Sequence, residues 1–334
     1  MFFWAVFLIV LVPLFAEAQS FLPFQPITRF GSFSELSSRL AGASLMVGYS
    51  TDRRGVTFGL NAEGAGNLGI FGFARYLGNT RSYPVRGVWL GGNLPVSLSE
   101  ALSVDLSGAY FLPTNREILE VQDWQIAGFL PVQPHQEWTT NIKWWNLSGE
   151  GIYQLSGNFA FVGGFRFDSF RSAFNGEAPP SIIPGAGLPG DRSDLDVFTY
   201  LPYLGATVSQ DWGSGQLKTR LIGFPYVPGT VKFSTTRNTT LFIFDIFDRF
   251  EASGAFRSGY FIEVSAEYGV RFGGLLASLF TQYDLLHGLA RVELDRTQEL
   301  FLGGKSTEAA YSLSFDRRVW TVGGKFELVF ASPL

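Results

Sequence analysis

Apolar and polar residues alternate with a period of two along most of the chain after residue 42. Near the C-terminal end, Trp320 and Val322 alternate with Thr321 and Gly323, and residues 43–50, 103–110 and 262–268 repeat the pattern. This period is typical of β-strands with one apolar and one polar face. No run of about 20 apolar residues occurs after residue 42, so no membrane-spanning helix is expected there. The pattern predicts an all-β fold.

Eight strands can be placed from residue 101 onward. Residues 42–97 must hold an even number, because the chain enters and leaves this part at the same end. Two long strands give ten in total, which is the prediction. The alternative is twelve, with turns at Asp52–Gly55, Glu63–Asn67 and Gly78–Arg81. The eight strands are predicted at 101–112, 138–155, 157–171, 197–212, 215–230, 257–272, 274–287 and 309–330.

The apolar positions change phase inside the first of these segments. They fall on odd numbers at Val47 and Tyr49 and on even numbers at Val56, Phe58 and Leu60. A turn at Asp52–Gly55 or a bulge there would each produce this change.

The connections between strands alternate between two kinds. Short turns, such as Gly213-Ser214-Gly215 and Gly273-Gly274, alternate with long segments rich in Pro, Gly and charge. The long segments are 113–137, 171–196, about 230–256 and about 288–308. Short periplasmic turns and long extracellular loops are typical of a transmembrane antiparallel β-barrel, which pairs every backbone group inside lipid. Aromatic residues near strand ends are expected to form the two interfacial girdles. These clusters lie at Trp144-Trp145, Phe165 to Phe170, Tyr200 to Tyr203 and Phe242 to Phe247.

Composition agrees with a surface that is partly out of water. Of 334 residues, 46% are hydrophobic and only 16% charged, against about 25% charged in soluble domains. The formal net charge of −4 argues against a nucleic-acid partner. The chain has no cysteine, which excludes disulfides and cysteine-ligated metals and suits passage through an oxidising periplasm.

The N-terminal segment predicts export. Residues 2–15 form an apolar run broken by Pro13, and Ala16-Glu17-Ala18 follows as a cleavage pattern. We predict a signal peptide at 1–18, a periplasmic tail at 19–41 and a barrel at 42–334. An uncleaved N-terminal anchor is the alternative, since no Lys or Arg precedes the run.

Several partners follow from a barrel in the bacterial outer membrane. The aromatic C-terminal strand, Trp320 to Phe330, resembles the signal read by the barrel-assembly machinery. Outer-membrane lipid, including lipopolysaccharide, is expected to contact the barrel, because arginines at the predicted outer ends can bind phosphates in bidentate fashion. The oligomeric state stays open. These arginines are Arg53, Arg54, Arg171, Arg192, Arg237 and Arg249.

One hairpin carries a family resemblance. Tyr200 to Thr207, a short turn and Gln216-Leu217-Lys218 resemble the middle hairpin of the omptins, which are ten-stranded outer-membrane proteases. The order of short turns and long loops is similar over roughly 85–330. The resemblance implies the same barrel and an aspartyl-type endopeptidase activity.

The catalytic pairs of that family are not retained. Omptins activate a water with an Asp-x-Asp pair facing an Asp-x-His pair, and the first would fall here at Val121-x-Asp123. The second should lie in 230–256, which has no histidine. General-base catalysis needs a group that titrates near the working pH, so a non-proteolytic role is the prediction. The carboxylates in that range are Asp245, Asp248 and Glu251.

Few other residues suggest chemistry. Asp123 and His135 share a long loop and are the candidate catalytic residues of a rearranged protease, although a solvent-exposed loop histidine is the simpler interpretation. His287 is expected to be an ordinary rim residue. Two distant histidines give no metal-ligand spacing, and no phosphate-binding or nucleophile motif occurs. We therefore expect no cofactor and no metal.

The function predicted from the sequence is binding or a structural role at the cell surface, through the long loops. An active protease is one alternative. A small-solute pore is another, because Lys143, Glu150, Arg166 and Glu263 are expected to face a wet lumen, although opposite charges could interlock and close a narrow barrel. A secreted soluble β-protein is the third.

Overall fold

The computed structural model describes residues 42–62, 74–114, 117–126, 130–133, 135–175, 192–241, 244–300 and 303–328. The predicted signal peptide, the predicted periplasmic tail and Phe330 lie outside these ranges, so they stay predictions. Within the described ranges, no helix is long and apolar enough to span a bilayer.

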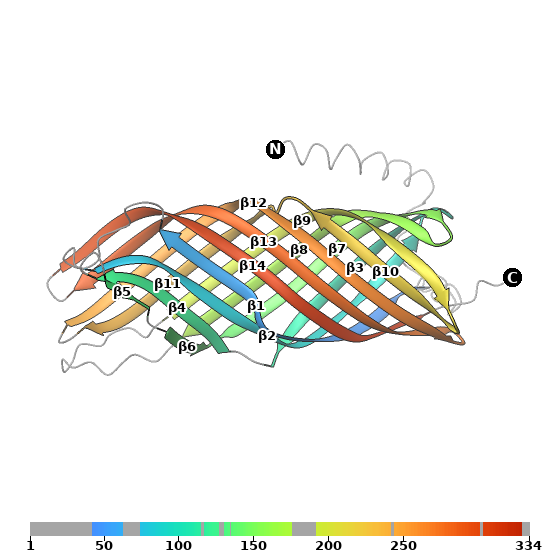
Figure 1. Ribbon diagram of the computed structural model, residues 1–334, viewed down its shortest axis with the longest axis horizontal. Helices are drawn as coiled ribbons and strands as arrows, with labels where there is room; N and C mark the ends of the chain where they lie inside the picture. The colour runs from blue at the N-terminus through green and yellow to red at the C-terminus, as the bar shows by residue number, and fades with distance from the viewer. Residues whose placement is uncertain are drawn as a thin grey trace, which may run out of the picture. The chain divides into compact units, whose positions relative to one another are not determined.

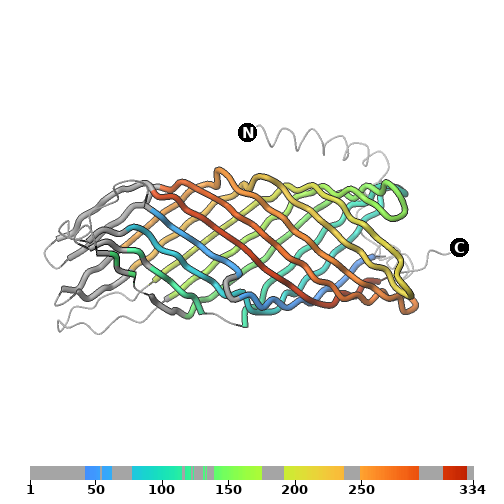
Figure 2. The backbone as a smooth tube through the Cα atoms, in the orientation of Figure 1, coloured from blue at the N-terminus to red at the C-terminus, as the bar shows by residue number. Residues whose placement is uncertain are grey.

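The described strands form one antiparallel sheet that closes on itself (Figures 1 and 2). Ten strands make the hydrogen-bonded ring, in the order β1-β14-β13-β12-β10-β9-β8-β7-β3-β2, and β2 pairs with β1 to close it. The strands are β1 (Ser44–Ala62), β2 (Ala74–Ser97), β3 (Leu102–Pro113), β4 (Glu117–Ile126), β5 (Leu130–Val132), β6 (His135–Thr139), β7 (Asn141–Ser156), β8 (Phe159–Asn175), β9 (Arg192–Trp212), β10 (Gly215–Phe224), β11 (Gly229–Leu241), β12 (Phe244–Phe272), β13 (Leu275–Leu300) and β14 (Gly303–Leu328).

The other strands extend the wall of the ring. β11 continues β10, because both pair with β9 and with β12. Between them Pro225 and Pro228 lack the N–H groups that a continuous ladder needs. β4 continues β3 along β2 in the same way, and β6 pairs with β4 just before β7 pairs with β3.

The ten-strand prediction is confirmed and the twelve-strand alternative is wrong. Asp52–Gly55 is a register shift inside β1, and Gly78–Arg81 lies within β2, so neither is a turn. Glu63–Asn67 lies outside the described residues. Much of the sequence predicted as long loops is strand, because β12 begins at Phe244 and β13 runs to Leu300.

The half of the barrel next to the short turns, here called the belt section, carries apolar side chains on its outside. On β9 the outward residues Phe198, Tyr200, Leu204 and Val208 are all exposed. Exposed apolar residues on the other ring strands continue this belt, so a hydrocarbon layer can cover it. They include Leu45, Leu90, Leu106, Leu147, Phe161, Leu221, Val264, Leu279 and Val322.

The half next to the long loops, here called the outer section, has the opposite arrangement. At the N-terminal end of β9, Arg192 and Asp194 point outward, and Leu195 and Val197 are buried inside. Phe58 and other apolar side chains also fill the interior at this level. The outer section is therefore built like a water-soluble barrel, with a packed core and a polar surface.

This inversion explains the change of phase in β1. Val47 and Tyr49 point outward to the belt, whereas Val56, Phe58 and Leu60 are fully buried inside. The shift in β1 adds two residues relative to β2, and an even number leaves the sides of the strand unchanged. The apolar side chains, rather than the backbone, change side where the barrel leaves the belt.

Candidate functional site

A network of buried charges crosses the lumen of the belt section. Arg166 Nη1 lies 2.9 Å from Glu263 Oε2 and 2.8 Å from Asp284 Oδ2. Its Nε lies 3.0 Å from Asp168 Oδ2. These side chains project inward from β8, β12 and β13, so one guanidinium joins different parts of the wall. A charge inside a barrel is stabilised only when it is paired in this way.

Arg317 of β14 completes the upper side of the network. Its Nε lies 2.7 Å from Asp284 Oδ1, and its Nη1 lies 3.0 Å from Asp168 Oδ2. The guanidinium also lies 5.5 Å from the centre of the Trp144 ring, a cation–π distance. Both arginines thus share the same two carboxylates, which ties β8, β13 and β14 together.

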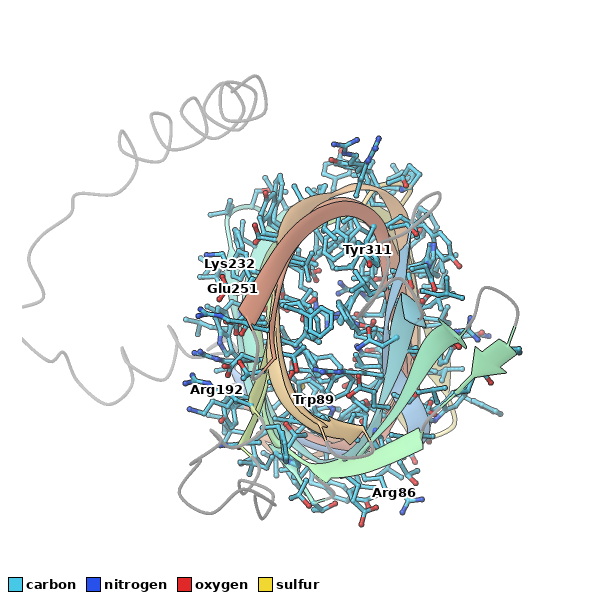
Figure 3. All side chains as sticks on the ribbon, turned by 90° about the vertical axis from the view of Figure 1, so that its left-hand side faces the viewer. Arg86, Trp89, Arg192, Lys232, Glu251 and Tyr311 are labelled. Atoms are coloured by element: carbon cyan, nitrogen blue, oxygen red, sulfur yellow. The ribbon has the colours of Figure 1, made fainter. Side chains whose placement is uncertain are left out.

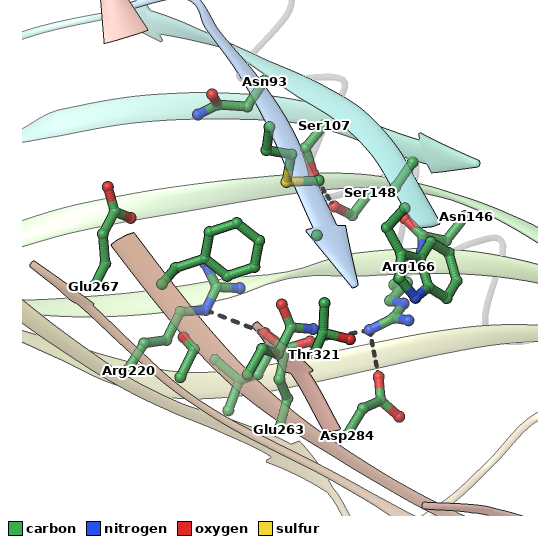
Figure 4. Close-up of a pocket in the computed structure, with 18 of the residues that line it drawn as sticks. Asn93, Ser107, Asn146, Ser148, Arg166, Arg220, Glu263, Glu267, Asp284 and Thr321 are labelled. Atoms are coloured by element: carbon green, nitrogen blue, oxygen red, sulfur yellow. Dashed lines mark hydrogen bonds and ion pairs between the residues drawn. The ribbon is translucent and has the colours of Figure 1, made fainter. Parts of the chain in front are cut away.

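The lower side of the network is formed by Arg220 of β10 and Glu150 of β7. The pair is bidentate, with Nη1–Oε1 and Nη2–Oε2 distances of 2.7 and 2.6 Å. The Tyr203 hydroxyl donates to the same carboxylate at 2.8 Å. Arg220 Nε is 3.9 Å from Glu263 Oε1, which connects this pair to Arg166 (Figure 4).

Aromatic side chains pack in the lumen on the side of the charged network that faces the outer section. Trp89 contacts Trp144 with ring centres 4.7 Å apart, and Phe111 and Phe170 each lie 5.7 Å from Trp144. Trp89 and Tyr311 point into the barrel, whereas Arg192, Lys232 and Glu251 point outward (Figure 3). The charged network and this aromatic layer together cross the lumen at this level.

A second buried ion pair lies inside the outer section. Arg81 Nε is 3.3 Å from Glu120 Oε2, and Asn79 Nδ2 donates to Glu120 Oε1 at 2.8 Å. Arg81 Nη1 also donates to the Ser193 hydroxyl at 2.5 Å. This pair joins β2, β4 and β9 across the core, a structural role.

Below the charged network the lumen is open. A cavity of about 240 Å³ lies there, with Asp105 and Lys218 among its lining residues. Trp89, Trp144 and Arg166 line it at one end, and it reaches Ser44 at the start of β1. Met46 and Phe280 also line it, so the belt section contains a chamber with both polar and apolar walls.

Asp123, the first candidate catalytic residue, lies in β4 and is partly exposed. By alternation it faces outward, opposite to Ile118 and Glu120, which are buried. Its Oδ1 accepts a hydrogen bond from Gln133 Nε2 at 2.7 Å. Asp123 therefore lies outside the filled interior of the outer section.

His135, the second candidate, begins β6 and pairs in register with Val121. It is thus two ladder positions from Asp123, on the same side of the hairpin. The structure does not describe its side chain, so a catalytic contact between the two stays a prediction. Asp245 and Asp248 lie in β12 without described side chains, and Glu251 accepts from Arg249 Nε at 2.8 Å on the surface.

His287 is more than a solitary rim residue. Its Nδ1 lies 2.6 Å from Asp316 Oδ1, and its ring lies 5.5 Å from that of Tyr260. By alternation along β13 and β14, this pair faces outward at the upper edge of the belt, beside Trp320. In the described part of the chain, no group of three or more His, Cys, Asp or Glu residues could hold a metal ion.

Several predicted positions are corrected. Glu150, Arg166 and Glu263 face the lumen as predicted, but Lys143 points outward and is exposed, because it lies between Ile142 and Trp144, which are buried. In the predicted girdles, Trp144, Phe170 and Tyr203 are likewise internal. For Trp144 and Phe170 the sequence carries a signal for this, because the charged residues Lys143 and Arg171 lie next to them on the opposite, outward face.

The predicted outer arginines lie on the surface where they are described. Arg171 Nε is 3.1 Å from Asp196 Oδ1, and Arg192 Nε is 2.9 Å from Asp194 Oδ2. Most of these side chains remain exposed, so such pairs contribute little to stability. Binding of lipid phosphate by them stays a prediction.

Comparisons with known proteins relate the chain to one fold. No family model matches the sequence, and no curated protein matches it. The outer membrane protease OmpT of Escherichia coli matches the structure with a TM-score of 0.55 and 11% identity, over 86% of this chain and 97% of that one.

Two autotransporter domains match less well. The β-domain of BrkA from Bordetella has a TM-score of 0.31 and 12% identity, over 87% of this chain and 100% of that chain. The translocator domain of NalP from Neisseria meningitidis has a TM-score of 0.29 and 9% identity, over 89% and 93%. The chain thus has the fold of an outer-membrane β-barrel with an omptin-like, ten-stranded layout.

Proposed function

We propose that this chain is a closed, non-proteolytic barrel of the outer membrane that presents a binding surface outside the cell. The layers of side chains that cross the lumen are the observation that carries the proposal. Arg166 and Arg317 lock four strands across the lumen, and the aromatic layer around Trp144 lies above them. A solute would have to displace both layers, which argues against a pore.

The same filling argues against a catalytic groove at the top of the barrel. A water-activating site needs carboxylates that face an open, substrate-sized space. In the described part of the outer section, the interior carboxylate Glu120 is held by Arg81 and Asn79, and apolar side chains surround it. The protease activity of OmpT is therefore not carried over to this chain.

Conductance and peptide cleavage, measured on one refolded preparation, test the proposal. We expect no discrete channel openings in planar bilayers and no cleavage of a basic-peptide library. An epitope inserted in 176–191 should be detected by antibody on intact cells, since surface binding requires these loops to be outside. Discrete openings, peptide cleavage or an epitope hidden on intact cells would each contradict the proposal.

A rearranged protease is the second candidate, and the hairpin that carries Asp123 and His135 favours it. Cleavage that is lost in both Asp123→Ala and His135→Ala would support this function. Asp211→Ala is the control, because Asp211 is an exposed carboxylate beside a short turn at the opposite end of the barrel. Cleavage unchanged in the two test variants would remove these residues as its source.

A further inference from the structure

The chamber in the belt section contains two opposite charges whose bonding capacity is not used. Asp105 projects into it from β3 and Lys218 from β10. The two line the same cavity, together with Glu150 and Lys325. Asp105 and Lys218 belong neither to the network around Arg166 nor to the proposed surface function.

Asp105 has one satisfied and one unsatisfied oxygen. Its Oδ2 accepts a hydrogen bond from Asn93 Nδ2 at 2.8 Å. Its Oδ1 is buried and has no hydrogen-bond partner. An unpaired carboxylate oxygen out of bulk water is costly, so this atom favours any donor that enters the chamber.

Lys218 offers the complementary charge. Among the described residues, its ammonium makes no hydrogen bond or ion pair, although it is half-buried. Lys325, which also lines the chamber, lies 3.4 Å from Glu267 Oε1 and 3.2 Å from Glu327 Oε2. Lys325 is thus already paired with two carboxylates, whereas Lys218 is the lysine of the chamber that can bind an anionic group.

The size and walls of the chamber restrict what fits there. Its volume of about 240 Å³ is far above the roughly 15 Å³ needed for one water. It is below the roughly 300 Å³ at which pockets for drug-sized ligands begin. Ser107 and Ser148 bond to each other at 2.6 Å in its wall and give further polar surface. A small polar solute is the matching class.

The two ends of the chamber differ. The route from the outer section passes through the charged network and the aromatic layer, whereas Ser44 and Lys325 line the chamber near the short-turn end. In an outer-membrane barrel that end faces the periplasm. A ligand would therefore come from inside the cell envelope rather than from outside.

We propose that the chamber binds a small zwitterion of amino-acid size from the periplasmic side. Its ammonium group donates to Asp105 Oδ1, and its carboxylate accepts from Lys218. A ligand with one charge would leave the other protein group unpaired, so both charges are needed for tight binding. This makes the lower lumen a binding site, in a barrel that is otherwise closed.

Equilibrium dialysis of the refolded full chain in detergent against radiolabelled L-alanine tests the proposal. We expect saturable binding of one molecule per chain. Ethylamine and propionate, which each carry only one of the two charges, should bind at least about tenfold more weakly, a loss of about 1.4 kcal/mol. Asp105→Asn and Lys218→Gln should each weaken alanine binding by a similar factor.

Matched variants on the outer surface serve as controls. Lys143→Gln and Asp196→Asn remove the same charges from outward positions on β7 and β9 and should leave alanine binding unchanged. Heat-modifiable migration reports whether each variant is folded. Three results would overturn the proposal: no saturable binding of alanine, equal binding of the single-charge probes, or binding unchanged in folded Asp105→Asn and Lys218→Gln. If a variant does not fold, the single-charge probes on the native chain still decide.

Discussion

Arg166 holds three carboxylates in a part of the lumen with little access to water. Its removal would leave Glu263, Asp284 and Asp168 with a deficit of positive charge, because Arg317 reaches only two of them. Breaking a buried ion pair from one side costs about 3–5 kcal/mol. We expect Arg166→Met to lower the free energy of unfolding by that amount, measured by urea titration in lipid vesicles.

A surface arginine of the same strand is the control for this prediction. Arg171 pairs with Asp196, but 56% and 46% of the two side chains remain exposed. Exposed pairs contribute about 0–1 kcal/mol to stability. Arg171→Met should therefore change the free energy of unfolding by less than about 1 kcal/mol. Equal losses in the two variants would show that the buried network does not stabilise the barrel.

At this scale the sequence predicts which face a residue lies on better than what it contacts. Glu150, Arg166 and Glu263 were predicted inside because apolar residues alternate with them. Their partners come from strands up to 118 residues away, as in the bond from Arg166 to Asp284, and periodicity carries no information on such distances. Lys143 lies outward, contrary to the prediction, because its apolar neighbours Ile142 and Trp144 are buried inside the barrel.

The wall of this barrel passes through two environments, and the adjacent strands β9 and β11 show the change. Leu204 of β9 lies outward in the belt with 66% of its surface exposed. Thr230 of β11 also lies outward and exposed, but in the outer section. An arginine facing lipid near the midplane costs about 2–4 kcal/mol. We expect Leu204→Arg to destabilise the barrel by that amount and Thr230→Arg to have almost no effect.

The same urea titration in vesicles measures both variants. If Thr230→Arg were as destabilising as Leu204→Arg, the outer section would also be covered by lipid. This inversion is why the element lengths were only partly predicted. The segments 230–256 and 288–308 are rich in charge and were expected to be loops, but much of that charge lies on the wet outside of long strands, as Arg249 and Glu251 do.

For the whole molecule, the number of strands and the barrel closure followed from alternation and from the two kinds of connection. Both signals are local, so the sequence displays them. The chamber and the charged network that crosses the lumen were not predictable, because they depend on which side chains meet across the barrel. Opposite charges in a narrow barrel indicate that ion pairs can form across it, and the contacts of Arg220 with Glu150 show one such pair.

The absence of cysteine allows the placement of the whole barrel in the membrane to be tested cleanly. Single-cysteine variants Leu45→Cys, Leu147→Cys, Leu204→Cys and Leu279→Cys sample the belt on four sides, where the native side chains are 73%, 54%, 66% and 73% exposed. In vesicles these thiols should resist a charged maleimide, since hydrocarbon excludes charge. They should react in detergent once the barrel is unfolded.

Thr230→Cys and Ser253→Cys are the control variants, because both positions lie outward in the outer section. In vesicles their thiols should react with the charged maleimide during an incubation in which the belt thiols do not. A belt that is protected on all four sides means that lipid surrounds the barrel, as a monomer or a loosely packed assembly requires. If one side alone reacted, water would reach the belt there. If both classes reacted equally, the apolar belt would not be in the bilayer, and the assignment of the chain to a membrane would fail.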